Sequence, residues 1–213
     1  MIDYNVFPKL PVLVNENDDL TAMENPFCTR RVRPGAIPYQ FPAGQTAESL
    51  VDQLRDAGWR GQIVGAHGSG KSTLLAALIP AIEQVGQSTL LIELHDAQRR
   101  LPIDLAHDPR LAPPLVVIVD GYEQLSRWSR FLLNRCCRKR GLGLLATSHS
   151  PVGLPDLART LASPGLAEQI VGELLRGRQW PLTATELHAC YSRHGGDLRE
   201  LLFELYDLYE QQA

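Results

Sequence analysis

Three glycines, a lysine and a serine at fixed spacing are the residues of this chain with the clearest chemical potential. They lie in one unbroken run, which is Gly65, Ala66, His67, Gly68, Ser69, Gly70, Lys71, Ser72 and Thr73. Residues 65–72 fit the pattern G-x-x-x-x-G-K-[ST]. Glycines let backbone amides close around phosphate oxygens with no Cβ in the way, and a following helix N-terminus adds positive potential. The run predicts a phosphate-binding loop, with Lys71 on the β- and γ-phosphates and Ser72 on Mg²⁺.

The residues on either side predict the elements that must position this loop. Residues 62–64 are a short apolar run typical of a strand, and apolar side chains recur at helical spacing between residues 71 and 84. A strand that delivers the loop and a helix that follows it are the context that makes the Walker A pattern specific. The alternative is a glycine-rich turn with a chance lysine.

Asp120 is the second candidate for chemistry. It ends a run of branched aliphatic residues, 115–119, which predicts a strand buried on both faces, as in a parallel sheet. An aspartate at the carboxyl end of such a strand is where the Walker B partner of Mg²⁺ belongs. Glu123 follows after Gly121 and either activates the attacking water or is only a first-turn acid favoured by a helix dipole.

A further strand, predicted over residues 141–146, ends in Thr147, Ser148 and His149. A polar side chain at the tip of a strand beside the phosphate-loop strand can sense the γ-phosphate or hold the attacking water. Ser148 and His149 are the candidates for this role. The alternative is that they only cap the strand end.

Composition limits the class of protein. The 213 residues are 44% hydrophobic and 21% charged, with net charge −3 and a pI near 6.1, which argues against a protein that mainly coats nucleic acid. The four cysteines form no C-x-x-C pair, so reduced thiols in the cytoplasm are expected. We find no leader pattern at the N-terminus and no uncharged apolar run long enough to span a membrane.

Patterning predicts three parts: an extended, proline-rich N-terminal arm over 1–44, a nucleotide-binding core over 45–163, and a helical lid over 164–213. Three segments of the arm, 25–27, 30–34 and 39–41, contain aromatic or basic residues. They could supply an aromatic wall or a basic contact to a nucleotide, and the alternative is that they form surface coil.

The helix predicted over 123–140 places several arginines within an arc of roughly 140°, with Leu125, Leu132 and Cys136 opposite. This basic face is either a solvated surface or a contact for a polyanion or a neighbouring subunit's phosphates. Its arginines are Arg127, Arg130, Arg135 and Arg138.

Together these motifs resemble the additional-strand class of P-loop ATPases. That resemblance implies an α/β three-layer sandwich around a parallel sheet of order 5-1-4-3-2, with a small C-terminal helical lid. Residues 195–201 resemble the sensor 2 segment of AAA+ ATPases, which makes Arg199 a γ-phosphate contact and puts His149 at the sensor 1 position, usually asparagine. Residues 25–27 resemble a motif that precedes the core in some AAA ATPases, and residues 120–123 are similar to the Walker B segment of STAND ATPases.

The resemblance implies ATP and Mg²⁺ as cofactors, and the chain has no N-K-x-D motif for guanine. We expect an ATP hydrolase that couples its nucleotide state to a protein partner or a second copy. Net charge does not indicate nucleic acid as the partner, although a local basic face leaves it open. Two alternatives are an ATP-binding switch with little hydrolysis, which Gly121 favours, and a small-molecule kinase closed by Arg135, Arg138 and Arg140. Arg159 and the basic helix are the candidate arginine fingers.

Overall fold

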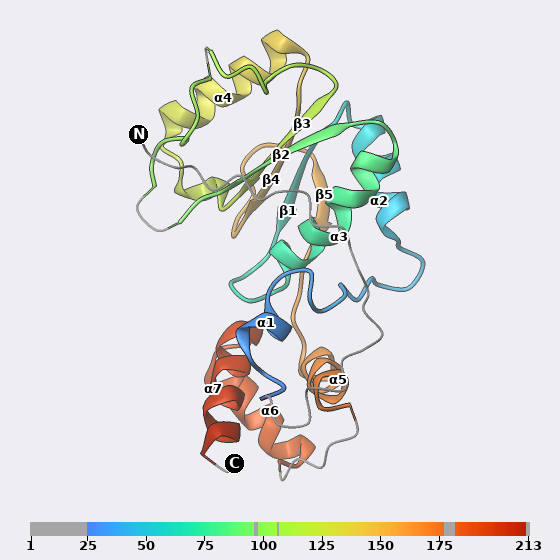
Figure 1. Ribbon diagram of the computed structural model, residues 1–213, viewed down its shortest axis with the longest axis vertical. Helices are drawn as coiled ribbons and strands as arrows, with labels where there is room; N and C mark the ends of the chain where they lie inside the picture. The colour runs from blue at the N-terminus through green and yellow to red at the C-terminus, as the bar shows by residue number, and fades with distance from the viewer. Residues whose placement is uncertain (1–24, 96–97, 106, 177–181, 212–213) are drawn as a thin grey trace.

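The computed structural model describes residues 25–95, 98–105, 107–176 and 182–211 (Figure 1). The elements in chain order are α1 (Thr29–Val32), α2 (Ala47–Asp56), β1 (Arg60–Val64), α3 (Lys71–Gln84), β2 (Ser88–Glu93), β3 (Leu115–Asp120), the 3₁₀ turn η1 (Tyr122–Gln124), α4 (Arg127–Arg140), β4 (Gly143–Ser148), β5 (Asp156–Arg159), α5 (Pro164–Leu175), α6 (Ala184–Arg193) and α7 (Leu198–Glu210). Among these residues, no helix is both long and apolar enough to cross a membrane.

The strands form one five-stranded sheet in the order β2-β3-β4-β1-β5, and every neighbouring pair is parallel. This confirms the predicted order, read from the opposite edge. In a parallel sheet all carboxyl ends of the strands meet at one edge, so the residues that follow β1, β3 and β4 are brought together there. The loop after β1, Asp120 at the end of β3 and His149 directly after β4 all lie at this edge.

Helices cover both faces of the sheet, and alternation along the strands explains why. Val117 and Val119 of β3 pack in one core cluster with Leu133 and Cys137 of α4, whereas Val116 and Ile118 pack in another with α2 and α3. All five apolar residues of β3 are buried, as expected for a central strand with helices on both sides. Figure 1 shows the resulting layers, with α4 on one side of the sheet and α2 and α3 on the other.

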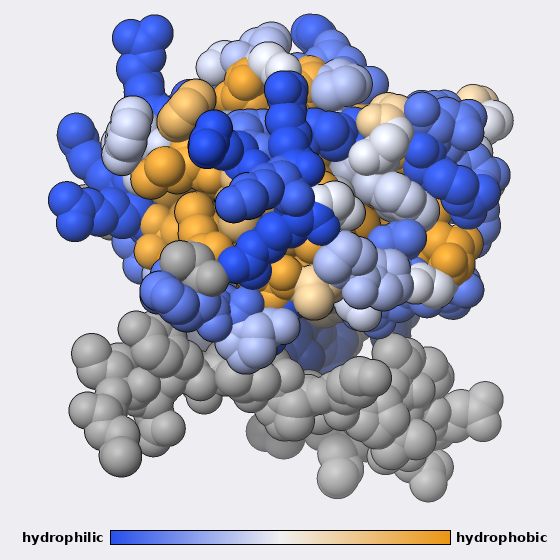
Figure 2. All heavy atoms as spheres, turned by 90° about the horizontal axis from the view of Figure 1, so that it is seen from above, coloured by the Kyte–Doolittle hydropathy of each residue, from blue (hydrophilic) through white to orange (hydrophobic). Residues whose placement is uncertain are grey.

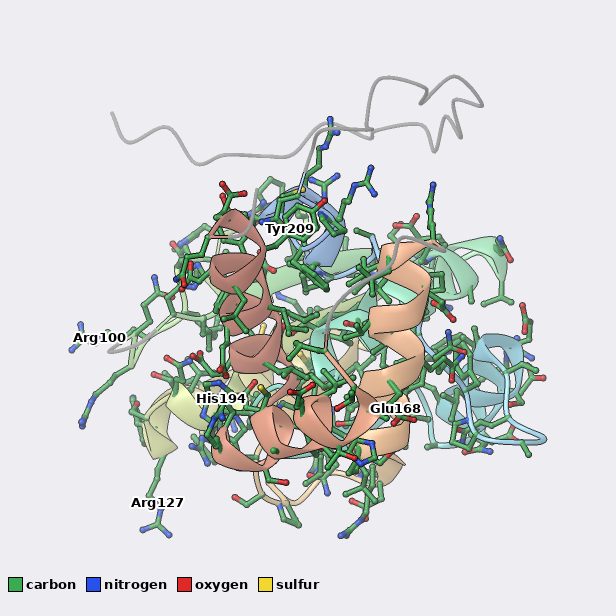
Figure 3. All side chains as sticks on the ribbon, turned by 90° about the horizontal axis from the view of Figure 1, so that it is seen from below. Arg100, Arg127, Glu168, His194 and Tyr209 are labelled. Carbon is green, nitrogen blue, oxygen red and sulfur yellow. The ribbon has the colours of Figure 1, made fainter. Side chains whose placement is uncertain are left out.

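The helices α5, α6 and α7 form a separate cluster below the sheet and bury a third core. Phe27 belongs to this core: it is 1% exposed, and its ring centroid lies 6.4 Å from that of Tyr209. The Asn25 amide donates to the Tyr206 carbonyl at 3.0 Å and to Glu210 Oε1 at 2.8 Å. Figure 3 shows Tyr209 beside α1. Residues 25–27 therefore pack on the cluster of α5, α6 and α7, and they do not form the aromatic wall for a nucleotide that was one of their predicted roles.

The predicted helix over 123–140 begins later than expected. Gly121 has φ +82° and opens η1, Leu125 is extended, and the Ser126 side chain then caps α4 by accepting from the Ser129 amide. The predicted faces of this helix were also partly wrong. Leu133 and Cys137 point into the core, so Leu132 is 37% exposed and lies on the outer side.

Candidate functional site

The loop after β1 needs glycine at several positions for reasons that the fold makes explicit. Gly68 and Gly70 have φ of +61° and +91°, a region that side-chain-bearing residues rarely adopt. A Cβ on Gly65 would overlap the Thr160 hydroxyl, and a Cβ on Gly68 would overlap the Asp197 carboxylate. The loop is therefore packed between the end of β5 and the start of α7, with no space for a side chain at Gly65 or Gly68.

The N-terminus of α3 faces this loop without a side-chain cap. Gly70 occupies the N-cap position and offers no oxygen to the first-turn amides of the helix. Uncapped amides and the helix dipole together favour an anion at this point. The Tyr39 ring lies close by, 3.7 Å from where a Cβ on Gly70 would stand, and it packs edge-on against Phe41 with ring centroids 4.9 Å apart.

Lys71 is folded into the loop. Its Nζ donates to the carbonyls of Gly65 at 2.8 Å and Ala66 at 2.7 Å. Burial lowers the pKa of Lys71, and the charges of Glu123, Asp120 and Asp197 oppose that effect. A cation held within the loop, with carboxylates nearby, is suited to phosphate oxygens.

Ser72 and Asp120 meet across the edge of the sheet. The Ser72 hydroxyl donates to Asp120 Oδ2 at 2.6 Å, and the Thr147 hydroxyl donates to Asp120 Oδ1. Thr147 in turn accepts from the Gly121 amide at 3.0 Å, so the carboxylate is held in one orientation. Hydroxyl and carboxylate oxygens are the ligands that Mg²⁺ prefers.

Two protein oxygens are a suitable set for a nucleotide-bound Mg²⁺. This ion usually keeps several waters and takes substrate phosphates as its remaining ligands. In the part of the chain that the structure describes, no group of three or more His, Cys, Asp or Glu side chains could hold a metal by itself. The site therefore fits a metal that arrives with a phosphate ligand, and not a metal held by protein alone.

Glu123 and His149 form a pair next to Lys71. The turn at Gly121 brings Glu123 round so that its Oε1 lies 3.0 Å from His149 Nδ1. Its Oε2 is buried and has no hydrogen-bond partner among the described residues. The His149 ring also packs on His67 of the loop, with ring centroids 3.8 Å apart. Burial lowers the pKa of His149, while the Glu123 charge acts in the opposite direction.

Ser148 and Thr147 have roles that sequence reasoning did not separate. Ser148 is fully buried, and its hydroxyl donates to the Ser150 carbonyl at 2.7 Å, away from Asp120. Sequence analysis missed Thr147 as the contact to Asp120. Alternation along the strand is the signal that could have indicated Thr147. Residues two apart share a face, so Thr147 lies on the same face as His149, which was already a candidate for the site, and Ser148 lies on the other.

The sensor 2 candidate lies at the start of α7. Asp197 caps this helix by accepting from the amides of Arg199 and Glu200, and its carboxylate packs on Gly68. Arg199 is exposed, and its charge is close enough to lower the pKa of Lys71. Helix α7 therefore touches the loop through its N-cap residue Asp197, and Arg199 lies in the first turn of the helix.

The remaining arginine candidates lie elsewhere. Arg159 pairs with Asp156 at 2.8 Å on β5. Arg138 lines a cavity together with Arg60 and Gly143, the residues at which β1 and β4 begin. It is therefore at the opposite edge of the sheet from the loop, and Arg140 donates to the Leu111 carbonyl. This arrangement gives no support to a kinase closed by the end of α4.

Comparison with known proteins identifies the fold of the chain but does not assign the chain to a family. No protein-family model matches this chain, and no curated protein matches it. Among solved structures, the ORC1 protein of Aeropyrum pernix, determined in complex with DNA, matches with a TM-score of 0.58 at 14% identity. The match covers 86% of this chain, which spans only 64% of the ORC1 chain. This similarity shows the fold alone, which is an α/β fold with helices on both faces of a five-stranded parallel sheet.

Proposed function

We propose that this protein binds ATP with Mg²⁺ at residues 65–73 and hydrolyses it, as an ATPase of AAA+ or STAND-like build. The observation that carries the proposal is the convergence of Lys71, Ser72 and Asp120, with Ser72 Oγ and Asp120 Oδ2 2.6 Å apart. A chance glycine-rich turn would not bring an aspartate from another strand onto the loop serine. The AAA+ type of fold agrees with this function.

Each residue has a distinct role in the proposal. The amides of the loop and of the first turn of α3 bind phosphate oxygens, and the Lys71 ammonium exchanges its loop carbonyls for the β- and γ-phosphates. Ser72 and Asp120 hold Mg²⁺, and Thr147 orients Asp120. Bound Mg²⁺ would neutralise charge that develops on the phosphate oxygens. Tyr39 is close enough to the loop to pack against the nucleoside.

Glu123 is the proposed general base. A water bonded to Glu123 Oε2 would complete the hydrogen bonding of a buried oxygen and could pass its proton to the carboxylate. His149 holds the other oxygen and so fixes the orientation of the carboxylate. His149 thereby acts as a positioning residue.

The lid couples the nucleotide state to a partner in this proposal. Asp197 packs against Gly68, so phosphates in the loop would meet a carboxylate of the lid and repel it. Arg199, two residues further on, would attract the γ-phosphate. The balance of these two charges makes the lid position depend on whether a triphosphate is bound.

An ATP-binding switch with little hydrolysis is the second candidate. The observation that favours it is the Glu123 to His149 contact of 3.0 Å, since a carboxylate held by a histidine is less free to take a proton. The chain also has Gly121 directly after Asp120, where many ATPases have glutamate.

Binding is tested by titration calorimetry with magnesium ATP. Loss of a charge-assisted phosphate contact costs about 2 to 4 kcal/mol, so Lys71→Ala should weaken affinity about 30- to 1000-fold. Lys139→Ala is a matched control, because it removes the same group from the exposed side of α4. Equal affinity of wild type and Lys71→Ala would refute nucleotide binding at this loop.

Hydrolysis is tested by phosphate release. If the protein is an ATPase, Glu123→Gln should reduce turnover at least about 100-fold while leaving ATP affinity nearly unchanged. Binding without any turnover in wild type would identify the switch instead.

A further inference from the structure

The outer side of α4 carries an apolar patch inside a basic surface. Trp128 is 68% exposed, Phe131 54% and Leu132 37%, and the Trp128 and Phe131 rings stack with centroids 5.6 Å apart. At about 100° per residue these three fall within an arc of roughly 140° that also holds the exposed cations Arg127, Arg135, Arg138 and Lys139. Figure 2 looks at this end of the molecule and shows hydrophobic atoms among long hydrophilic side chains.

The four exposed cations of this surface have no side-chain partner among the described residues. The helix sequence itself contains no acidic residue. Arg130, by contrast, is used internally: it donates to the Glu123 and Leu125 carbonyls and lies over the Tyr122 ring. Figure 3 shows Arg127 pointing away from the body of the protein.

A groove lies beside the apolar patch. Its volume is about 720 Å³, and it lies between α4 and residues 152–154. Phe131 and Leu154 give the groove apolar walls, and Arg135 and Arg138 line its rim. A groove of this kind accepts apolar side chains that are accompanied by carboxylates.

The lid helix α7 carries the complementary surface. Phe203 is 45% exposed and Tyr206 37%, and these two residues have the same one-turn spacing as Trp128 and Phe131. The exposed acid Glu200 lies about one turn before Phe203, and the exposed Asp207 lies about one turn after Phe203, next to Tyr206. Arg199 is the exposed cation near this face. Of the eight large hydrophobic side chains exposed among the described residues, the five on α4 and α7 are the only ones gathered on helix faces of opposite charge.

These two faces cannot meet within one molecule. Figure 1 shows α4 at one end of the long axis and α7 at the other. We propose that α7 of one copy docks on the α4 face of the next, with its aromatic pair against Trp128 and Phe131 and its acids against Arg135 and Arg138. Such contacts are heterologous, so they continue head to tail and produce a ring or a filament.

The expected affinity of this contact is modest and depends on salt. A single helix pair buries less area than a standard interface of about 800 Å² per partner, so association requires concentrated protein. The charges are exposed, so salt screens them. A nucleic acid would pair with the cations of α4 but would leave α7 unused, and the net charge of −3 opposes it.

The test uses the full chain and two matched double variants in sedimentation velocity, with and without magnesium ATP. Trp128→Ala with Phe131→Ala removes the α4 face, and Phe203→Ala with Tyr206→Ala removes the α7 face. Each alone should raise the dissociation constant of self-association about 30-fold or more. An equimolar mixture should form a heterodimer that does not grow, because one intact face of each kind remains.

Controls separate this interface from loss of folding and from other partners. Val85→Ala with Leu91→Ala removes two exposed apolar side chains outside both faces and should leave association unchanged. Glu200→Lys with Asp207→Lys should abolish association, and Arg135→Glu with Arg138→Glu added as a second protein should restore it. Circular dichroism checks that each variant is folded.

Three results would overturn the proposal. The first is a wild-type monomer at about 100 µM in low salt, with and without nucleotide. The second is unchanged self-association of either aromatic double variant. The third is a mixture of the two variants that stays monomeric, which would indicate a symmetric interface. Binding of a fluorescent oligonucleotide that depends on α4, in a wild-type protein that stays monomeric, would identify a polyanion as the partner instead.

Discussion

Replacing Thr147 by valine would remove one buried hydroxyl with almost no change in side-chain shape. In the folded protein this hydroxyl donates to Asp120 Oδ1 and accepts from the Gly121 amide at 3.0 Å, and Thr147 has no exposed surface. A bond to a charged group is worth about 1.5 to 3 kcal/mol, and an amide left without its acceptor costs about 1 to 3 kcal/mol. Because the two terms overlap, we expect Thr147→Val to lower the free energy of unfolding by about 2 to 4 kcal/mol.

The same substitution should also affect magnesium. Without the Thr147 hydroxyl the Asp120 carboxylate loses one of its two orienting bonds, and weakened outer-shell partners typically reduce metal affinity about 10- to 100-fold. Urea unfolding measures the stability, and ATP titration at a series of Mg²⁺ concentrations measures the metal affinity. Thr147→Ser keeps the hydroxyl and is the control, with a small loss in both assays. The usual effect of a surface substitution on the free energy of unfolding is about 0.5 kcal/mol. The reasoning is refuted if Thr147→Val changes the free energy of unfolding by less than this and binds ATP with the same dependence on Mg²⁺ as wild type.

Three further predictions concern the lid, the histidine and the loop. Phe27→Ala should lower the free energy of unfolding by about 3 to 5 kcal/mol in urea titrations, because the ring is 1% exposed in the lid core; unchanged stability would show that residues 25–27 do not belong there. Burial lowers the pKa of His149 below 6.5, so between the two pKa values the unfolded chain binds more protons and stability falls as pH falls below about 6.5. His149→Gln should therefore lose less stability than wild type between about pH 7 and pH 5.5 in thermal melts, and parallel losses would contradict this. Gly65→Ala should destabilise the fold by about 1 to 3 kcal/mol by overlap with Thr160, as thermal unfolding would show, whereas a wild-type melting temperature would mean that the loop can move aside.

Much of the core follows from local sequence. The aliphatic run of β3 has no polar position on either face, so only a central strand covered by helices on both sides can accommodate it. Gly68 and Gly70 occupy backbone conformations that glycine alone adopts without strain, which is why the loop could be recognised from residue types. The strand order was implied by resemblance, and it agrees with the structure.

The parts that sequence reasoning did not predict depend on distant contacts. Asn25 bonds to Tyr206 and Glu210, residues that are 181 and 185 positions away, so nothing local to the arm indicated its place in the lid. Strand alternation groups Thr147 with His149 and separates Ser148, but the three-dimensional structure is needed to know which face meets Asp120. The faces of α4 were predicted from helical spacing alone, which put Leu132 on the side opposite the arginines. In the structure Leu133 is the buried leucine, and Leu132 is 37% exposed on the outer side.

The central claim is that Ser72 and Asp120 hold the magnesium of a nucleotide bound at residues 65–73. Calorimetric titration of ATP into wild type and Asp120→Asn, each with Mg²⁺ and with EDTA, tests it most directly. We predict that Mg²⁺ tightens ATP binding to wild type at least about tenfold and has little effect on Asp120→Asn, which keeps the side-chain shape but loses the charge. No heat of binding in wild type, or an equal effect of Mg²⁺ on both proteins, would contradict the claim.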